Sequence, residues 1–253
     1  MSFFKWLIQI IYCLYAFFIF ALLTLMAFPL VMISLLFGYF KGGNMIYEIC
    51  RYWAATWFIL IGVRHQMVYE HPHDTGKQWV FVANHISYMD IPPIVLMAPQ
   101  PIRVLGKFES SRIPIFGWIY RAAAIMVDRS NPETRAQSFR ELKTALKNGL
   151  SIFLFPEGTF NMQEDKPLKS FFDGAFRLAI ETQTPIKPMI LPDTLDRLHF
   201  RSLFSLTPGR CRVVFLEEVP VEGMDITQLS VLKEKVYQIM DQALRRYRHY
   251  PSA

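Results

Sequence analysis

The stretch WVFVANHISYMD, residues 79–90, contains the pattern that decides the fold of this chain. Its first five residues are apolar and are typical of a buried strand, and the run ends at Asn84 and His85. The carboxylate of Asp90 follows five residues after the histidine. A buried strand that ends at a histidine and a nearby carboxylate indicates that a rigid element presents titratable groups at its end.

Short strand-like runs alternate with helix-like runs from residue 64 to the C-terminus, which predicts an α/β domain with a sheet covered by helices. The expected strands are His65–Tyr69, Val80–Ala83, Ile102–Gly106, Ala124–Val127, Ser151–Phe155, Ile186–Leu191 and Arg212–Leu216. The expected helices are Ile91–Met97, Ile113–Arg121, Pro132–Asn148, Gly174–Gln183 and Ser230–Tyr247. Because no internal repeat or Gly/Ser linker interrupts this part, residues 64–253 are expected to form one catalytic domain.

Residues 1–63 form a separate apolar segment, in which no charged residue occurs from Trp6 to Phe40. As one helix this run would rise roughly 50 Å, well beyond the ~30 Å of a hydrocarbon core, so it must bend. Pro29 is the expected position of the bend, which would give a hairpin or a spanning helix followed by a shallower one. After an expected break at residues 42–44, Met45–Val63 is either an interfacial helix or a core helix of the following domain.

The composition of the chain is strongly hydrophobic and moderately basic. Its 253 residues are 52% hydrophobic and carry a formal charge of +6, which fits a protein that sits on anionic lipid or handles anionic substrates. No run of lysine and arginine with interleaved aromatic residues is present, so no nucleic-acid partner is expected. The three cysteines lack the spacing of a metal site or a disulfide framework, which indicates a reducing compartment.

His85 and Asp90 can be interpreted in two ways. The functional interpretation is a general base whose imidazole is oriented by a carboxylate, so that the second ring nitrogen can take a proton from an alcohol. The alternative is a half-buried histidine at a strand end and an aspartate that caps a helix. No serine or cysteine is spaced as an obvious nucleophile, so direct attack by a substrate hydroxyl is favoured over a covalent intermediate.

A second group of residues, Phe155-Pro156-Glu157-Gly158-Thr159, follows another expected strand. Pro156 stops strand pairing, Gly158 permits unusual backbone angles, and Glu157 is expected to be displayed at the sheet edge with backbone amides nearby. The alternative is a plain tight turn.

Lys107 and Arg129 also follow strand-like runs, so both could project at the same sheet edge as His85. Two cations there would suit a phosphate group. Taken singly, each is more often a solvated surface charge.

These groups together resemble the conserved blocks of the glycerolipid acyltransferases. Asn84–Asp90 matches the NHxSxxD block and Phe155–Thr159 the FPEGT block. The segment that contains Lys107 and Arg129 falls where the second block lies, and Thr184–Pro188 resembles the fourth. The resemblance covers Val80–Leu191, and the N-terminal apolar segment resembles the membrane-docking helices of this family.

The resemblance implies a single mixed sheet flanked by helices and transfer of a fatty acyl chain to the hydroxyl of a lysolipid. The donor would be acyl-coenzyme A or acyl-carrier protein, and the expected acceptor is 1-acyl-sn-glycerol-3-phosphate, which gives phosphatidic acid. No metal or redox cofactor is expected. The protein would be a membrane enzyme whose catalytic domain lies on the cytoplasmic face of the inner membrane.

The resemblance also implies residue roles. His85 would be the general base, and Asp90 would hold its tautomer and stabilise the imidazolium. Substrate-binding residues would be Lys107 and Arg129 for the acceptor phosphate, and Glu157, Gly158 and Thr159 for the acceptor pocket, with Asn84 and Ser87 in support. Backbone amides near Gly158 are candidate donors to the thioester oxygen in the transition state.

One residue departs from the pattern. The family usually has an arginine after the threonine of the third block, and that residue is associated with the acceptor phosphate, whereas this chain has Phe160. Either Lys107, Arg129, Lys166 or Lys169 substitutes for it, or the acceptor is a different lysolipid, such as a lyso-aminolipid or another lysophospholipid. A third hypothesis is a catalytically silent lipid-binding protein that keeps the fold.

Overall fold

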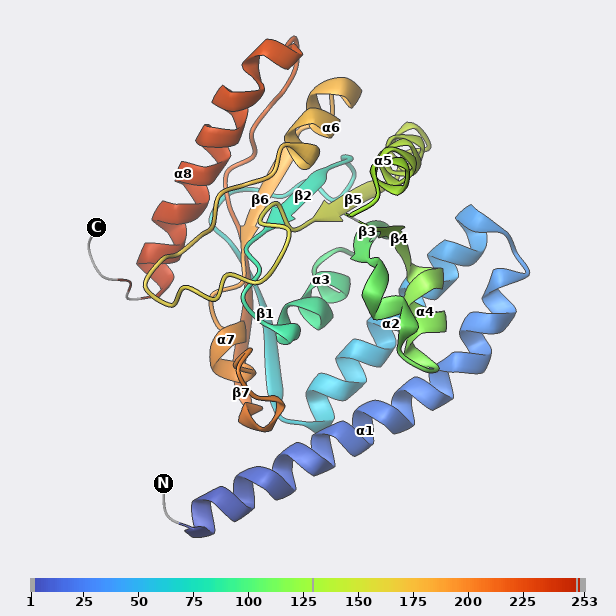
Figure 1. Cartoon of the computed structure of the whole chain (residues 1–253), viewed down its shortest axis with the longest axis vertical. Helices are drawn as coiled ribbons and strands as arrows, with labels where there is room; N and C mark the ends of the chain where they lie inside the picture. Colours follow the sequence, from blue (N-terminus) through green and yellow to red (C-terminus); the bar gives the residue numbers. More distant parts are fainter. Residues whose placement is uncertain (1–2, 129, 249, 251–253) are drawn as a thin grey trace.

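The computed structural model describes residues 3–128, 130–248 and 250, and its centre is one mixed sheet (Figure 1). The strand order is β1-β7-β6-β2-β5-β3-β4, and all neighbours pair in parallel except the antiparallel β6 and β7. The strands are β1 Val63–Tyr69, β2 Val80–Ala83, β3 Ile102–Lys107, β4 Ala124–Val127, β5 Ser151–Leu154, β6 Ile186–Ile190 and β7 Gly209–Phe215. The expected α/β fold with a single mixed sheet is therefore confirmed.

The helices expected after residue 64 are all present, apart from differences at their ends, and one short helix, Thr194–Arg197, was not expected. The helices are α1 Phe3–Leu35, α2 Tyr39–Leu60, α3 Ile91–Met97, α4 Phe116–Ala123, α5 Pro132–Lys147, α6 Gly174–Thr182, α7 Thr194–Arg197 and α8 Leu229–Tyr247. Short 3₁₀ turns are η1 Tyr88–Asp90, η2 Phe108–Arg112, η3 Leu203–Ser205 and η4 Ile226–Gln228. The start expected at Ile113 is wrong, because Ile115 has a φ of 62° and α4 begins only after it.

Helices cover both faces of the sheet, so both faces are buried. Successive side chains along a strand point to opposite faces, and a strand such as β2 therefore contributes to both apolar clusters. Val80 and Val82 of β2 lie in the apolar cluster that α5, α6 and α8 complete. Phe81 and Ala83 lie in the cluster on the other face, together with Tyr47 of α2 and residues of α3. This burial explains why the strands read as continuous apolar runs in the sequence.

The N-terminal segment is a helical hairpin, one of the two predicted alternatives, but its turn does not lie at Pro29 as expected. Helix α1 continues through Pro29 to Leu35, and the chain reverses at Gly38, which has a φ of 78°. One proline removes only one helical hydrogen bond, whereas a left-handed glycine redirects the whole backbone. The break expected at residues 42–44 is also wrong, because these residues lie inside α2.

Helix α1 is anchored to the rest of the protein along its length. Tyr12 donates to the carbonyl of Ile61 (2.7 Å) at one end, and Ser34 is buried at the other. Helix α2 packs one face into the core: the Tyr47 hydroxyl donates to the carbonyl of Ala98 (2.9 Å), while Tyr52 on another face is exposed. The core-helix interpretation of this segment is therefore confirmed for the face that bears Tyr47. The division into residues 1–63 and 64–253 stays a prediction.

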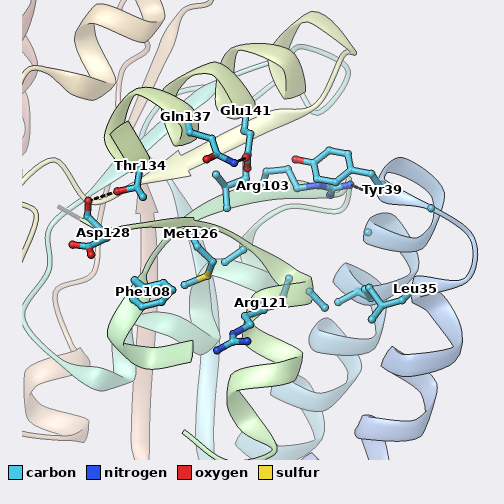
Figure 2. A pocket seen from close by; sticks show the side chains of 17 residues that line it. Leu35, Tyr39, Arg103, Phe108, Arg121, Met126, Asp128, Thr134, Gln137 and Glu141 are labelled. Carbon is cyan, nitrogen blue, oxygen red and sulfur yellow. Dashed lines mark hydrogen bonds between the residues drawn. The ribbon is translucent and has the colours of Figure 1, made fainter. Parts of the chain in front are cut away.

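A buried arginine fastens the hairpin turn to the sheet. The Arg103 guanidinium on β3 donates to the side chain of Asn44 (3.0 Å) and to the carbonyls of Tyr39 and Phe40 (both 3.4 Å). Figure 2 shows Arg103 and Tyr39 beside a cavity of about 530 Å³ between the hairpin turn, β4 and α5. His85 does not line this cavity, so the catalytic candidates lie elsewhere.

Close packing of the hairpin depends on Gly42. A Cβ atom at this position would lie 2.2 Å from the Ser34 carbonyl oxygen, so no side chain fits without separating α1 from α2. We expect Gly42→Ala to lower the free energy of unfolding by about 1–3 kcal/mol, the usual range for overpacking. Thermal unfolding in detergent would measure this. Gly174→Ala is the matched control, because nothing lies within 4 Å of its Cβ; an equal loss in both variants would contradict the packing argument.

Candidate active site

The candidate residues gather at one edge of the sheet. Strands β6, β2, β5, β3 and β4 run in the same direction, so their carboxyl ends share an edge, where α/β proteins usually bind ligands. Asn84 and His85 follow β2, Phe155–Thr159 follow β5, and Lys107 ends β3. Asn84 links this edge across strands, since its side-chain oxygen accepts from the Leu191 amide (2.7 Å) at the end of β6.

Asp90 orients His85 by direct contact. Its Oδ2 atom lies 2.8 Å from His85 Nδ1 and also accepts from the backbone amides of Ile86 (2.8 Å) and Ser87 (2.9 Å). The carboxylate is fully buried, whereas the histidine side chain is 15% exposed. A carboxylate held in this way accepts the Nδ1–H of the neutral imidazole, which leaves Nε2 with its lone pair free.

Ser87 builds the local turn that makes this contact possible. Its hydroxyl oxygen accepts from the Met89 amide (2.9 Å), and together with Asp90 it forms the capping box of η1. The same hydroxyl donates to the carbonyl of Leu198. Ser87 is fully buried, so its role is to hold the turn and not to act as a nucleophile.

Aromatic rings fix the plane of the imidazole. Phe155 stacks on His85 with ring centres 3.7 Å apart and an interplanar angle of 8°. Phe160 meets the imidazole edge to face at 4.4 Å, and Tyr88 in turn packs on Phe160 at 4.8 Å. No described residue hydrogen-bonds to Nε2, so this nitrogen is available to a substrate hydroxyl.

Glu157 lies deeper than the sequence suggested. It was expected to be displayed at the sheet edge, but it is fully buried. Its Oε1 accepts from the His85 amide (2.8 Å) and its Oε2 from the Lys169 amide (2.8 Å). Burial raises the pKa of this carboxyl group to about 8, which outweighs the two amide hydrogen bonds that favour the ionised form. Glu157 therefore braces the two segments that flank the base.

The backbone amides of the turn after Glu157 form hydrogen bonds within the turn itself. Gly158 has a φ of 73°, as expected for a glycine at this position. Its amide donates to the Phe155 carbonyl (3.0 Å), and the Thr159 amide donates to the Glu157 carbonyl (2.9 Å). The expectation that amides near Gly158 receive the thioester oxygen is therefore not met by these two donors.

Of the two predicted substrate-binding cations, the structure describes Lys107, which has partners on its own segment and on α4. Lys107 is exposed and forms an ion pair with Glu109 (3.4 Å), and its amide donates to the hydroxyl of Tyr120 (2.9 Å). Arg129 lies outside the described residues. Thr159 is exposed, and its hydroxyl accepts from the Lys169 ammonium (2.6 Å).

Sequence reasoning missed two residues that shape the site. Phe155 was expected as the last residue of a strand and the first of the Phe155–Thr159 group, with no role of its own, yet it stacks on His85. The Asn161 amide donates to the His85 carbonyl (2.7 Å), and the Asn161 side chain bonds the Gln163 amide and the Lys166 carbonyl, which fixes the loop beside the base. The position of Asn161 next to Phe160 was the one sequence signal that pointed to its role in fixing this loop.

A family model described as Acyltransferase matches residues 64–191. The chain belongs to this acyltransferase family. It is 29% identical to a 1-acyl-sn-glycerol-3-phosphate acyltransferase of Limnanthes douglasii over 224 residues, covering 86% of this chain and 76% of that protein. It is 27% identical to the alpha form of that enzyme from Homo sapiens, covering 72% of this chain and 64% of that protein.

Among solved structures, the fold is similar to the 1-acyl-sn-glycerophosphate acyltransferase of Thermotoga maritima. The TM-score is 0.75 at 23% identity, and the match covers 98% of this chain and 99% of that chain. At this identity the similarity concerns the fold, including the N-terminal helices. The family match and the His85–Asp90 geometry together identify the carboxyl edge of the sheet as the candidate active site of this acyltransferase.

Variants of His85 and Asp90 test their proposed catalytic roles, and we expect both variants to keep the fold. We expect His85→Ala to abolish measurable acyl transfer while the protein still unfolds cooperatively. Asp90→Asn keeps an oxygen acceptor for the three N–H donors but loses the charge that stabilises an imidazolium, so turnover should fall by about 10²–10⁴-fold. Initial rates of thioester consumption would measure both effects. Retained activity in His85→Ala would refute the assignment of the base.

The buried Glu157 predicts how stability depends on pH. Because its pKa is raised to about 8 from an ordinary 4.5, the folded protein binds more protons than the unfolded chain between these values. Stability should therefore fall as pH rises from 4.5 towards 8.

Glu157→Gln tests this dependence, because the glutamine cannot ionise and can accept only one of the two amides. At pH 5 the variant should be less stable by about 1–3 kcal/mol, and the gap should narrow towards pH 8. Thermal midpoints in detergent across this range would measure it. Parallel curves for the two proteins would contradict the prediction.

Proposed function

We propose that this acyltransferase moves a fatty acyl chain from a thioester to the free hydroxyl of 1-acyl-sn-glycerol-3-phosphate and so forms phosphatidic acid. The observation that carries the proposal is the buried Asp90 on Nδ1 of His85, with Nε2 left open at the sheet edge. The names of the plant and animal relatives support the acceptor.

The reaction follows from the tautomer of His85. Nε2 takes the proton of the substrate hydroxyl while the oxygen attacks the thioester carbonyl carbon. Asp90 stabilises the imidazolium that forms. When the tetrahedral intermediate collapses, the carbon–sulfur bond breaks and the imidazolium returns its proton to the leaving thiolate. Stacking on Phe155 limits rotation of the ring during both proton transfers.

The donor is proposed to be acyl-coenzyme A or acyl-carrier protein. Both are thioesters of the cytoplasm, so we propose that the catalytic domain lies on the cytoplasmic face of the inner membrane. The three cysteines are free, in keeping with that compartment.

Membrane binding is proposed to occur through α1. Within the described part of the chain, α1 is the one helix with the length and composition to cross a membrane. Its large apolar side chains, including Phe18, Leu25 and Met26, are exposed, while the opposite stripe packs on the protein along most of the helix. A helix held to its own domain in this way fits an orientation within one leaflet better than a transmembrane one.

Phe160 supports a second candidate, O-acylation of another lysolipid. Its ring packs on His85, so the position next to the base offers no forked cation to a phosphate monoester. A lyso-aminolipid or a phosphodiester lysolipid would need such a cation less.

A panel of lysolipids distinguishes the two candidates. Purified protein with acyl-coenzyme A should give its highest kcat/KM with 1-acyl-sn-glycerol-3-phosphate. Phe160→Arg should lower KM for phosphate-bearing acceptors several-fold and leave KM for acceptors without phosphate unchanged. A clear preference of the wild type for an aminolipid would favour the second candidate, and no turnover with any acceptor would refute both.

A further inference from the structure

A groove of about 770 Å³ opens beside Phe160, between the loop after β5 and helix α8. Three lysines line it: Lys166, Lys169 and Lys233. Lys233 is neutralised by an ion pair with Asp173 (2.6 Å). By contrast, no described carboxylate pairs with Lys166 or Lys169, and the Lys169 ammonium has only the neutral Thr159 hydroxyl as its partner (2.6 Å). Glu234 also lines the groove, but no described ion pair joins it to Lys166 or Lys169, so both lysines are open to an anion.

This end of the groove is built onto the catalytic base. The Glu157 carboxylate spans from the His85 amide to the Lys169 amide, with both hydrogen bonds 2.8 Å long. Phe160 belongs to both places, since its ring packs on the imidazole and also lines the groove. The Glu157 side chain thus links the backbone of Lys169 to the backbone of His85.

The proposed acceptor requires a phosphate site close to the imidazole of His85. In 1-acyl-sn-glycerol-3-phosphate, only two carbons and one ester oxygen separate the reacting hydroxyl from the phosphorus atom. When that hydroxyl lies at His85 Nε2, the phosphate must lie close to the residues that surround the imidazole. A phosphate dianion is bound well only where cations or N–H and O–H donors meet it. Phe160 supplies none from its side chain.

We propose that Lys169 and Lys166 bind the phosphate of the acceptor, with the Thr159 hydroxyl as a neutral partner. The inference rests on the proposed function and names the cations that the site uses for it. Lys169 exchanges or shares its contact with Thr159 when the phosphate arrives, and Lys166 closes the site from the loop that Asn161 fixes. Of the two other candidate cations, Lys107 is already paired with Glu109 at the end of β3, and Arg129 lies outside the described residues.

Kinetics of single variants test the assignment. Lys169→Met should raise KM for 1-acyl-sn-glycerol-3-phosphate about tenfold, and Lys166→Met by a smaller factor, because a charge-assisted hydrogen bond is lost. KM for acyl-coenzyme A and the rate with a 1-monoacylglycerol, which lacks phosphate, should stay unchanged. Lys169→Arg should restore most of the affinity. Lys147→Met, at the end of α5 and outside the groove, is the matched control.

Inorganic phosphate provides an independent measurement. It should compete with 1-acyl-sn-glycerol-3-phosphate in the wild type, and its inhibition constant should rise in the double variant Lys166→Met with Lys169→Met.

Three results would overturn the assignment. One is an unchanged KM for the phosphate acceptor in Lys169→Met while Lys107→Met raises it. Another is an increase in KM for acyl-coenzyme A instead, which would indicate that the lysines bind the acyl donor. The third is an equal loss with both acceptors, which would indicate a structural role. A wild type that does not acylate 1-acyl-sn-glycerol-3-phosphate would refute the proposed function itself, so the two failures are distinguishable.

Discussion

The buried carboxyl group of Glu157 is central to the site, because it joins two segments that are distant in the sequence. His85 follows β2 and Lys169 lies in the long loop after β5, and each donates its backbone amide to one oxygen of this carboxylate. Burying a charged group is costly without partners, and here the cost appears as a pKa raised to about 8. Near neutral pH the proton largely stays on Glu157, and both oxygens can still accept the two amides. The interaction therefore holds without a full buried negative charge next to Asp90.

Asp90 differs from Glu157, since the proposed role of His85 as a base requires a negative charge beside the ring. Three N–H groups converge on Oδ2, which fixes both the carboxylate and the ring that it orients. The other oxygen, Oδ1, is buried and accepts no hydrogen bond from a described residue. The buried negative charge in contact with the ring favours an imidazolium over the neutral imidazole, which suits the proposed role of His85.

The sequence predicted the local parts of this arrangement and missed the long-range ones. The strands and most helices after residue 64 were readable because buried parallel strands appear as short apolar runs, and the His85–Asp90 contact was readable because five residues and a capping turn bring the pair together. The burial of Glu157 and the stacking of Phe155 on His85 depend on pairing between β2 and β5, which no local pattern encodes. The hairpin was misplaced for a related reason: Pro29 is a strong local signal, but the turn lies where Gly38 and the close approach at Gly42 allow two helices to pack.

The positions of α1 and α8 suggest how an amphipathic substrate would fit the whole molecule. The two helices lie on opposite sides of the protein in Figure 1, with α3, which directly follows Asp90, between them. Helix α1 presents exposed apolar side chains, whereas α8 borders the groove that contains Lys166 and Lys169. A lysolipid has the same polarity, with an acyl chain at one end, a charged headgroup at the other and the reacting hydroxyl between them. In the proposed function, the acyl chain of the lysolipid would lie towards the apolar side chains of α1 and its phosphate towards Lys166 and Lys169, with the reacting hydroxyl at His85.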